Sequence, residues 1–111
     1  MDHHLNTCPI RGAVFDMDGL LLDTERIARL TQQRSARELG AVISDELYAR
    51  LVGVSEEEST RILLSQLGAD FPMPRYRSLS RGYFWEQVTQ NGVPLKPGAR
   101  EMLEFLSAHG I

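Results

Sequence analysis

The sequence has one cysteine, one lysine and no run of basic residues, and each shortage argues against a class of protein. Cys8 cannot form a disulfide within the chain and no catalytic partners surround it, so we interpret this thiol as incidental. The formal charge is -3 and the cations are scattered, so the chain lacks the positive patch that binds nucleic acid or an anionic membrane surface. We expect no nucleic-acid or membrane partner, and small-molecule chemistry is favoured.

Long hydrophobic runs are also absent. Residues 1–9 have neither a basic start nor a hydrophobic centre, so we predict no signal peptide and no membrane span. The sequence has three histidines. His3 and His4 lie near the terminus and His109 ends a predicted helix, and these positions argue against a histidine metal site. With 42% hydrophobic and 24% charged residues the composition is typical of a soluble globular protein, and we expect it to be cytoplasmic.

Hydrophobic periodicity predicts one strand followed by a series of helices. Residues 10–15 (IRGAVF) form a short apolar run that ends abruptly at Asp16, as a buried parallel strand would. A helix is predicted over residues 24–39, because apolar positions recur at helical spacing and Gly40 follows. The chain therefore enters its helical part directly after an acidic loop.

Serines mark the starts of the next two predicted helices. Ser44 begins a short helix that ends before Gly53. Ser55 and Glu58 have the spacing of a capping box, in which the hydroxyl and the carboxylate each satisfy a backbone amide of the other residue. Gly68 ends that second helix.

The second half of the chain contains two more helices separated by a connector. A helix over residues 75–90 has an apolar stripe that we assign to the core. Residues 91–98 hold two prolines and two glycines and are predicted to connect two bodies. A last helix ends at His109, and Ile111 stands where an α/β chain would start its next strand. Three aromatic residues of the 75–90 helix are expected to pack between helices rather than to form a stacking platform: Tyr83, Phe84 and Trp85.

The segment that carries most chemical information is FDMDGLLLDTE, residues 15–25. Asp16 and Asp18 directly follow the predicted strand, and in open parallel sheets ligands bind beyond the carboxyl ends of strands. Two carboxylates one residue apart on an irregular turn can face one pocket, where a hard, oxygen-preferring cation such as Mg²⁺ offsets their repulsion. Paired acids beside such a metal suit phosphoryl transfer.

Two alternatives for this acidic loop are weaker. Acidic residues can cluster by accident, but Asp-x-Asp-Gly-x-x-x-Asp directly after an apolar run is a rare coincidence at ordinary composition. A helix-loop-helix calcium site needs its glycine after a third liganding position, and Gly19 comes too early for that. We therefore treat Asp16 and Asp18 as a functional pair.

FDMDGLLLDTE resembles the first signature of the haloacid dehalogenase (HAD) superfamily, and the similarity extends over essentially all of the chain from Ile10. The continuation resembles the branch with a small helical cap inserted after that signature, which includes sugar-phosphate phosphatases and beta-phosphoglucomutases. The resemblance implies an α/β, HAD-like fold, a Rossmannoid core with an inserted α-helical cap bundle, of which this segment is mostly α. It implies three parts: the first core strand and catalytic loop (1–23), the cap (24–92), and a connector returning to the core (93–111).

The resemblance also implies roles for single residues. Asp16 corresponds to the nucleophile that forms an aspartyl-phosphate, Asp18 to the general acid and base, and both to ligands of the cofactor Mg²⁺. Gly19 would let the backbone approach the phosphate of the implied partner, a small phosphorylated metabolite. Gly53 lies in a segment that resembles the specificity loop of phosphoglucomutases. Glu25 either orients the hinge or touches substrate, and the alternative is a solvated acid of the first helical turn.

Departures from the family pattern refine these expectations. Where phosphoglucomutases place a lysine and an arginine for the distal phosphate, this chain has Val52 and Glu56, which favours simple hydrolysis of a monophosphate, for example a sugar phosphate. A phosphoglucomutase-like phosphotransferase and a non-catalytic helical interaction module are the alternatives. The single lysine, Lys96, lies in the connector and is not assigned the family's catalytic role.

The remaining signatures of the family have no room in the 111 residues. They are a Ser or Thr after the second core strand, a lysine that neutralises the transferring phosphoryl group, and acids that complete the metal site. We therefore expect an amino-terminal portion of a phosphohydrolase, inactive by itself and able to self-associate through exposed core surface.

Overall fold

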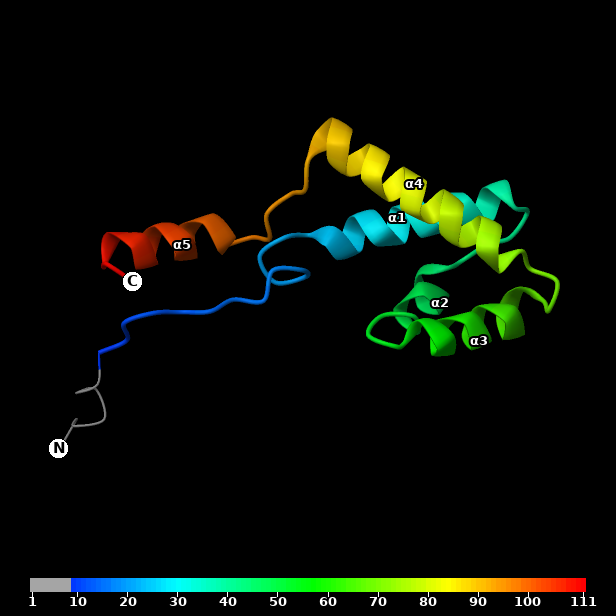
Figure 1. Ribbon diagram of the computed structural model, residues 1–111, viewed down its shortest axis with the longest axis horizontal. Coiled ribbons are helices and arrows are strands. Elements are labelled where there is room, and N and C mark those ends of the chain that lie inside the picture. The colour runs from blue at the N-terminus through cyan, green and yellow to red at the C-terminus, as the bar shows by residue number, and fades with distance from the viewer. Residues whose placement is uncertain (1–8) are drawn as a thin grey trace. The chain divides into compact units, whose positions relative to one another are not determined.

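The computed structural model describes residues 9–111, and all regular elements within that range are α-helices (Figure 1). The predicted, mainly helical character of this segment is confirmed. Predictions that concern His3, His4 and Cys8 fall outside the described residues. The helices are α1 (Thr24–Glu38), α2 (Asp45–Ala49), α3 (Glu56–Leu67), α4 (Met73–Asn91) and α5 (Ala99–Ala108).

The strand predicted over residues 10–15 is not formed in the described part of the chain. A strand requires a hydrogen-bonded neighbour, and residues 9–111 provide only isolated bridges that join Leu22 to Asp18 and to Leu95. Ile10 and Val14 of the run are exposed, Val14 completely, and Phe15 is half-buried. The strand prediction was wrong for residues 10–15. The sequence pattern predicts an apolar segment, but this segment becomes a strand only when another strand forms hydrogen bonds with it.

The chain divides into two compact units. Among the described residues, the first comprises residues 9–24 together with Pro94–Ile111, and it contains the acidic loop and α5. The second comprises Glu25–Val93 and contains the other helices. The assignment of residues 24–92 to a cap domain stays a prediction.

Serine caps start α2 and α3 as predicted. The Ser44 hydroxyl accepts the amide of Leu47 at 3.1 Å, and the Ser55 hydroxyl accepts the amide of Glu58 at 3.1 Å. The second half of the capping box is not formed, since the Glu58 carboxylate instead accepts the Arg61 Nε at 2.9 Å. Arginine one turn further along the helix is a charged donor, and it outcompetes the neutral backbone amide for the carboxylate.

Helix α4 begins at Met73, two residues before the predicted start. Pro74 lies in its first turn, where a missing amide hydrogen removes no helical bond. Of its aromatic residues, Phe84 is half-buried as expected but Trp85 is 60% exposed, so the packing prediction was wrong for Trp85. The reason is geometric: at roughly 100° per residue, Trp85 lies on the face opposite to Tyr76, which is buried.

The second unit has a compact apolar core. Leu63 of α3 and Tyr76 of α4 are nearly inaccessible at 1% and 2% exposure. Helices α1 and α4 lie side by side (Figure 1), and the Tyr76 hydroxyl donates to the Gln32 side-chain oxygen at 2.9 Å. The buried residues come from all four helices and from the loops between them: Ala36, Ile43, Leu47, Tyr48, Ile62, Leu63, Phe71, Met73 and Tyr76.

Helix α5 is amphipathic and exposes most of its apolar side. Ala99 is buried at its start, whereas Met102 and Phe105 are 48% and 57% exposed. Across residues 9–111 no helix has the length and apolar character needed to cross a membrane.

Candidate functional site

The acidic loop after residue 15 folds back on itself in a tight turn. The Gly19 amide donates to the Leu22 carbonyl at 2.9 Å, and the Leu22 amide donates to the Met17 carbonyl at 3.0 Å. Asp16 and Asp18 flank Met17, and both are exposed. The turn thus presents two carboxylates to solvent on a short hydrogen-bonded frame.

Gly19 has a φ of +76°, in the left-handed region that side chains rarely adopt. A Cβ at this position would meet nothing within 4 Å, so the backbone conformation, and not the available space, is what requires glycine. The resemblance implies that Gly19 leaves room for a phosphate. The structure gives a second reason for glycine at position 19, because the turn that carries Asp18 requires a positive φ there.

A second chain segment holds the end of the acidic loop. The Asp23 amide donates to the Pro94 carbonyl at 2.8 Å, and the Lys96 amide donates to the Leu21 carbonyl at 2.8 Å. The Lys96 Nζ also lies 3.7 Å from an Asp23 carboxylate oxygen, and both side chains are partly buried. Lys96 therefore ties the loop to the connector, a role that no local spacing in the sequence indicates.

The other predicted site residues, Glu25 and Gly53, belong to the second unit. Glu25 is exposed in the first turn of α1, and its backbone carbonyl accepts the Tyr48 hydroxyl at 3.4 Å. Gly53 is exposed, with a φ of +76° in the turn after α2. The structure brings Asp16, Asp18 and Gly19 together in one loop of the first unit, and contact of Glu25 and Gly53 with substrate stays a prediction.

Asp16 and Asp18 supply carboxylate oxygens, the ligands that Mg²⁺ prefers. Among residues 9–111, however, no group of three or more His, Cys, Asp or Glu side chains is placed to hold a metal ion. The two aspartates therefore fit part of a magnesium site and do not complete one.

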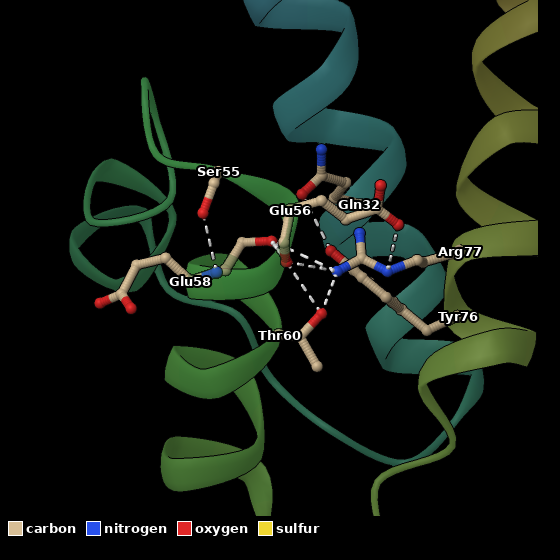
Figure 2. Close-up of polar contacts among 8 residues, drawn as sticks. Gln32, Ser55, Glu56, Glu58, Thr60, Tyr76 and Arg77 are labelled. Carbon is tan, nitrogen blue, oxygen red and sulfur yellow. Dashed lines mark hydrogen bonds and ion pairs between the residues drawn. The ribbon is translucent and has the colours of Figure 1, made fainter.

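A separate cleft of about 390 Å³ opens between α1, α3 and α4 in the second unit. Figure 2 shows Arg77 reaching from α4 to the first turn of α3, where its guanidinium donates to the Thr60 hydroxyl and lies 3.5 Å from the Glu56 carboxylate. Tyr76 and Gln32 also line the cleft, and their hydrogen bond joins α4 to α1.

Burial shapes the chemistry of the tyrosines in this cleft. It raises the pKa of Tyr76 to about 12 and also raises the pKa of Tyr48 above its ordinary value. Both therefore remain neutral hydroxyl groups at physiological pH. The sequence pattern places Tyr76 in the core, but gives no sign that Arg77 beside it would bridge two helices.

The comparison with protein families gives one match over most of the chain. The pattern of the family described as Haloacid dehalogenase-like hydrolase matches residues 13–111. The resemblance inferred from FDMDGLLLDTE is therefore confirmed.

Several curated proteins are similar to this chain. It is 30% identical over 106 residues to a phosphorylated carbohydrates phosphatase of Thermotoga maritima, covering 92% of this chain and 47% of that protein. It is 28% identical to a Drosophila melanogaster protein described as a pseudouridine-5'-phosphatase, covering 88% and 42% of the two chains. It is 32% identical to a mitochondrial (DL)-glycerol-3-phosphatase of Arabidopsis thaliana, covering 92% and 34%.

This chain is also similar to a solved structure. A Thermotoga maritima crystal structure described as that of a beta-phosphoglucomutase matches with a TM-score of 0.62 and 29% identity, over 86% of this chain and 44% of that one. The chain spans less than half the length of each of these relatives.

Proposed function

This chain belongs to the haloacid dehalogenase-like hydrolase family, and from that premise we propose that the whole protein is a magnesium-dependent phosphatase of a small phosphorylated metabolite, such as a sugar phosphate. The observation that carries the proposal is the pair Asp16 and Asp18, exposed together on a hydrogen-bonded turn. Three relatives that bear phosphatase names support it.

In this mechanism Asp16 is the nucleophile, and Asp18 donates and accepts protons. A carboxylate oxygen of Asp16 attacks phosphorus and forms an aspartyl-phosphate, while the bond to the leaving oxygen breaks and Asp18 gives that oxygen its proton. Asp18 then takes a proton from water, whose oxygen attacks the phosphorus, releases inorganic phosphate and restores Asp16. Each carboxylate ends the cycle in its starting protonation state.

Magnesium, when bound, would neutralise charge on the transferring phosphoryl group. Asp16 and Asp18 are the residues of this chain that would hold it. The described residues do not complete its ligand set, and the attack and the proton transfers are carried by the two aspartates.

We favour hydrolysis over phosphotransfer between sugars because of Glu56, the first residue of α3. A mutase needs a cation to hold the second phosphate of its bisphosphate intermediate, whereas Glu56 brings a carboxylate that is 78% exposed and already paired with Arg77. The likeness to a protein described as a beta-phosphoglucomutase keeps phosphotransfer as the second candidate.

The assay for this proposal measures both reactions of the whole protein. With Mg²⁺ and a panel of phosphorylated sugars and polyols, we expect release of inorganic phosphate without a bisphosphate activator, and loss of that release on chelation. If glucose 1-phosphate is isomerised faster than phosphate is released, the protein is a mutase and the assignment to a phosphatase is wrong.

A further inference from the structure

The end of the acidic loop is attached to the connector by a short antiparallel pairing of the backbone. Leu22 and Leu95 face each other in an antiparallel bridge. Beside this bridge the Asp23 amide donates to the Pro94 carbonyl at 2.8 Å. In a regular antiparallel pair the opposite residue would return a second hydrogen bond, but proline has no amide hydrogen to donate. This side of the bridge therefore has one hydrogen bond where two are usual.

The other side of the bridge is also one hydrogen bond short. The Lys96 amide donates to the Leu21 carbonyl at 2.8 Å. The Leu21 amide does not return a bond to Lys96, because it donates to the Met17 carbonyl at 3.1 Å inside the acidic loop. Two isolated strands are only marginally stable even with all their hydrogen bonds. With half of them, this pairing needs a further contact to hold the loop in one position.

The Lys96 and Asp23 side chains provide such a contact. The residues on either side of a bridged pair point to the same face, so Asp23 and Lys96 are diagonal neighbours across the bridge. A long side chain can span that diagonal, and the Lys96 Nζ lies 3.7 Å from an Asp23 carboxylate oxygen. The two side chains are only 35% and 24% exposed, so water screens this ion pair less than it screens a pair on the surface.

The ion pair also gives a role to the third aspartate of the acidic motif. Asp23 closes the pattern Asp-x-Asp-Gly-x-x-x-Asp that begins at Asp16. Among residues 9–111 it joins no group of three or more His, Cys, Asp or Glu side chains that could hold a metal ion. Its carboxylate is instead paired with Lys96, the one lysine of the sequence.

We propose that Lys96 is a positioning residue, which holds Asp23 on the connector and thereby fixes the loop that carries Asp16 and Asp18. The loop is otherwise held by hydrogen bonds within itself and by the incomplete pairing, so removal of the Lys96 charge loosens its end. Small displacements of a nucleophile or of a proton donor are costly for the rate of reaction. The effect on turnover rests on the proposed phosphatase function, whereas the effect on the loop does not.

The first test measures the loop itself and needs no turnover. Amide hydrogen exchange is followed in the whole protein and in Lys96→Met, which keeps an unbranched apolar side chain but removes the charge. We expect the amides of Leu22 and Asp23 to exchange up to about fivefold faster in Lys96→Met, and at the wild-type rate in Lys96→Arg. Arg100→Met is the matched control, because Arg100 is an exposed cation of α5 in the same unit, and it should leave both amides unchanged.

A double-mutant cycle shows whether the effect passes through Asp23. Asp23→Asn keeps the shape of the side chain and should accelerate exchange as Lys96→Met does, while the double variant should exchange no faster than either single variant. Additive acceleration, unchanged exchange in Lys96→Met, or equal acceleration by Arg100→Met would overturn the proposal.

The second test uses phosphate release by the whole protein. We expect Lys96→Met to lower kcat by about threefold to fivefold with KM within about twofold of the wild-type value, and Lys96→Arg to restore kcat. A rise in KM at constant kcat would show that Lys96 binds substrate and would contradict a positioning role. If the wild-type protein releases no phosphate, the phosphatase function is wrong, and amide exchange alone decides whether Lys96 fixes the loop.

Discussion

Asp16, Arg77 and Lys96 differ in how far their roles depend on residues close in sequence. Asp16 is recognisable as a candidate nucleophile because its motif is contained within a few residues. The partners of Arg77 and Lys96, in contrast, lie far away along the chain, at Glu56 and Asp23. Such pairs form only when tertiary packing brings helices or loops together, so spacing in the sequence cannot indicate them.

Tyr76 provides a test at this scale, because burial raises its pKa from 10.0 to about 12. The folded chain then holds this proton more tightly than the unfolded chain, so the contribution of Tyr76 to stability is complete below pH 10 and is lost as the pH rises to about 12. We expect the free energy of unfolding, measured with urea, to fall across this window.

In Tyr76→Phe that fall should be less steep, while at neutral pH the loss of the hydrogen bond to Gln32 should cost about 1 kcal/mol. Comparison of the two proteins at pH 8 and at pH 11 measures both effects. An equally steep fall in Tyr76→Phe would contradict the assignment of this pH dependence to Tyr76.

At the scale of elements, helices could be predicted where their signals are local. Ser44 and Ser55 start α2 and α3 through their own hydroxyl groups, and Gly68 ends α3. The strand over residues 10–15 could not be established in the same way, since its apolar pattern needs a hydrogen-bonded partner from elsewhere. Helix caps are properties of a single turn, whereas strands are properties of a sheet.

The cap of α3 can be tested by truncating its hydroxyl. Ser55→Ala leaves the Glu58 amide without its acceptor and should lower the free energy of unfolding by about 1 kcal/mol. Ser65→Ala is the matched control, because Ser65 is exposed within the same helix and alanine is a good helix former. We expect the urea concentration at the midpoint of unfolding to be lower for Ser55→Ala than for the wild type. For Ser65→Ala it should equal or exceed the wild-type value. Equal midpoints for the two variants would mean that the Ser55 cap does not stabilise α3.

At the scale of the whole molecule, the segment contains the first acidic signature and a helical unit with its own core, and it spans less than half of its relatives' length. The family assignment could be predicted because FDMDGLLLDTE is contiguous. The complete active site could not, because phosphoryl transfer requires a cation and further metal ligands. Among residues 9–111, no ion pair involves Asp16 and no group of three or more His, Cys, Asp or Glu side chains is placed to hold a metal ion.

The most direct test of the account is phosphate release from p-nitrophenyl phosphate by the whole protein with Mg²⁺, compared with its Asp16→Asn variant. Asparagine keeps the shape of the side chain but removes the nucleophilic carboxylate, so we expect turnover to fall by at least about a thousandfold. Asp70→Asn is the control, since Asp70 is an exposed residue in the loop between α3 and α4, and it should keep wild-type turnover. If Asp16→Asn retains turnover comparable to that of Asp70→Asn, Asp16 is not the nucleophile and the proposed mechanism is wrong.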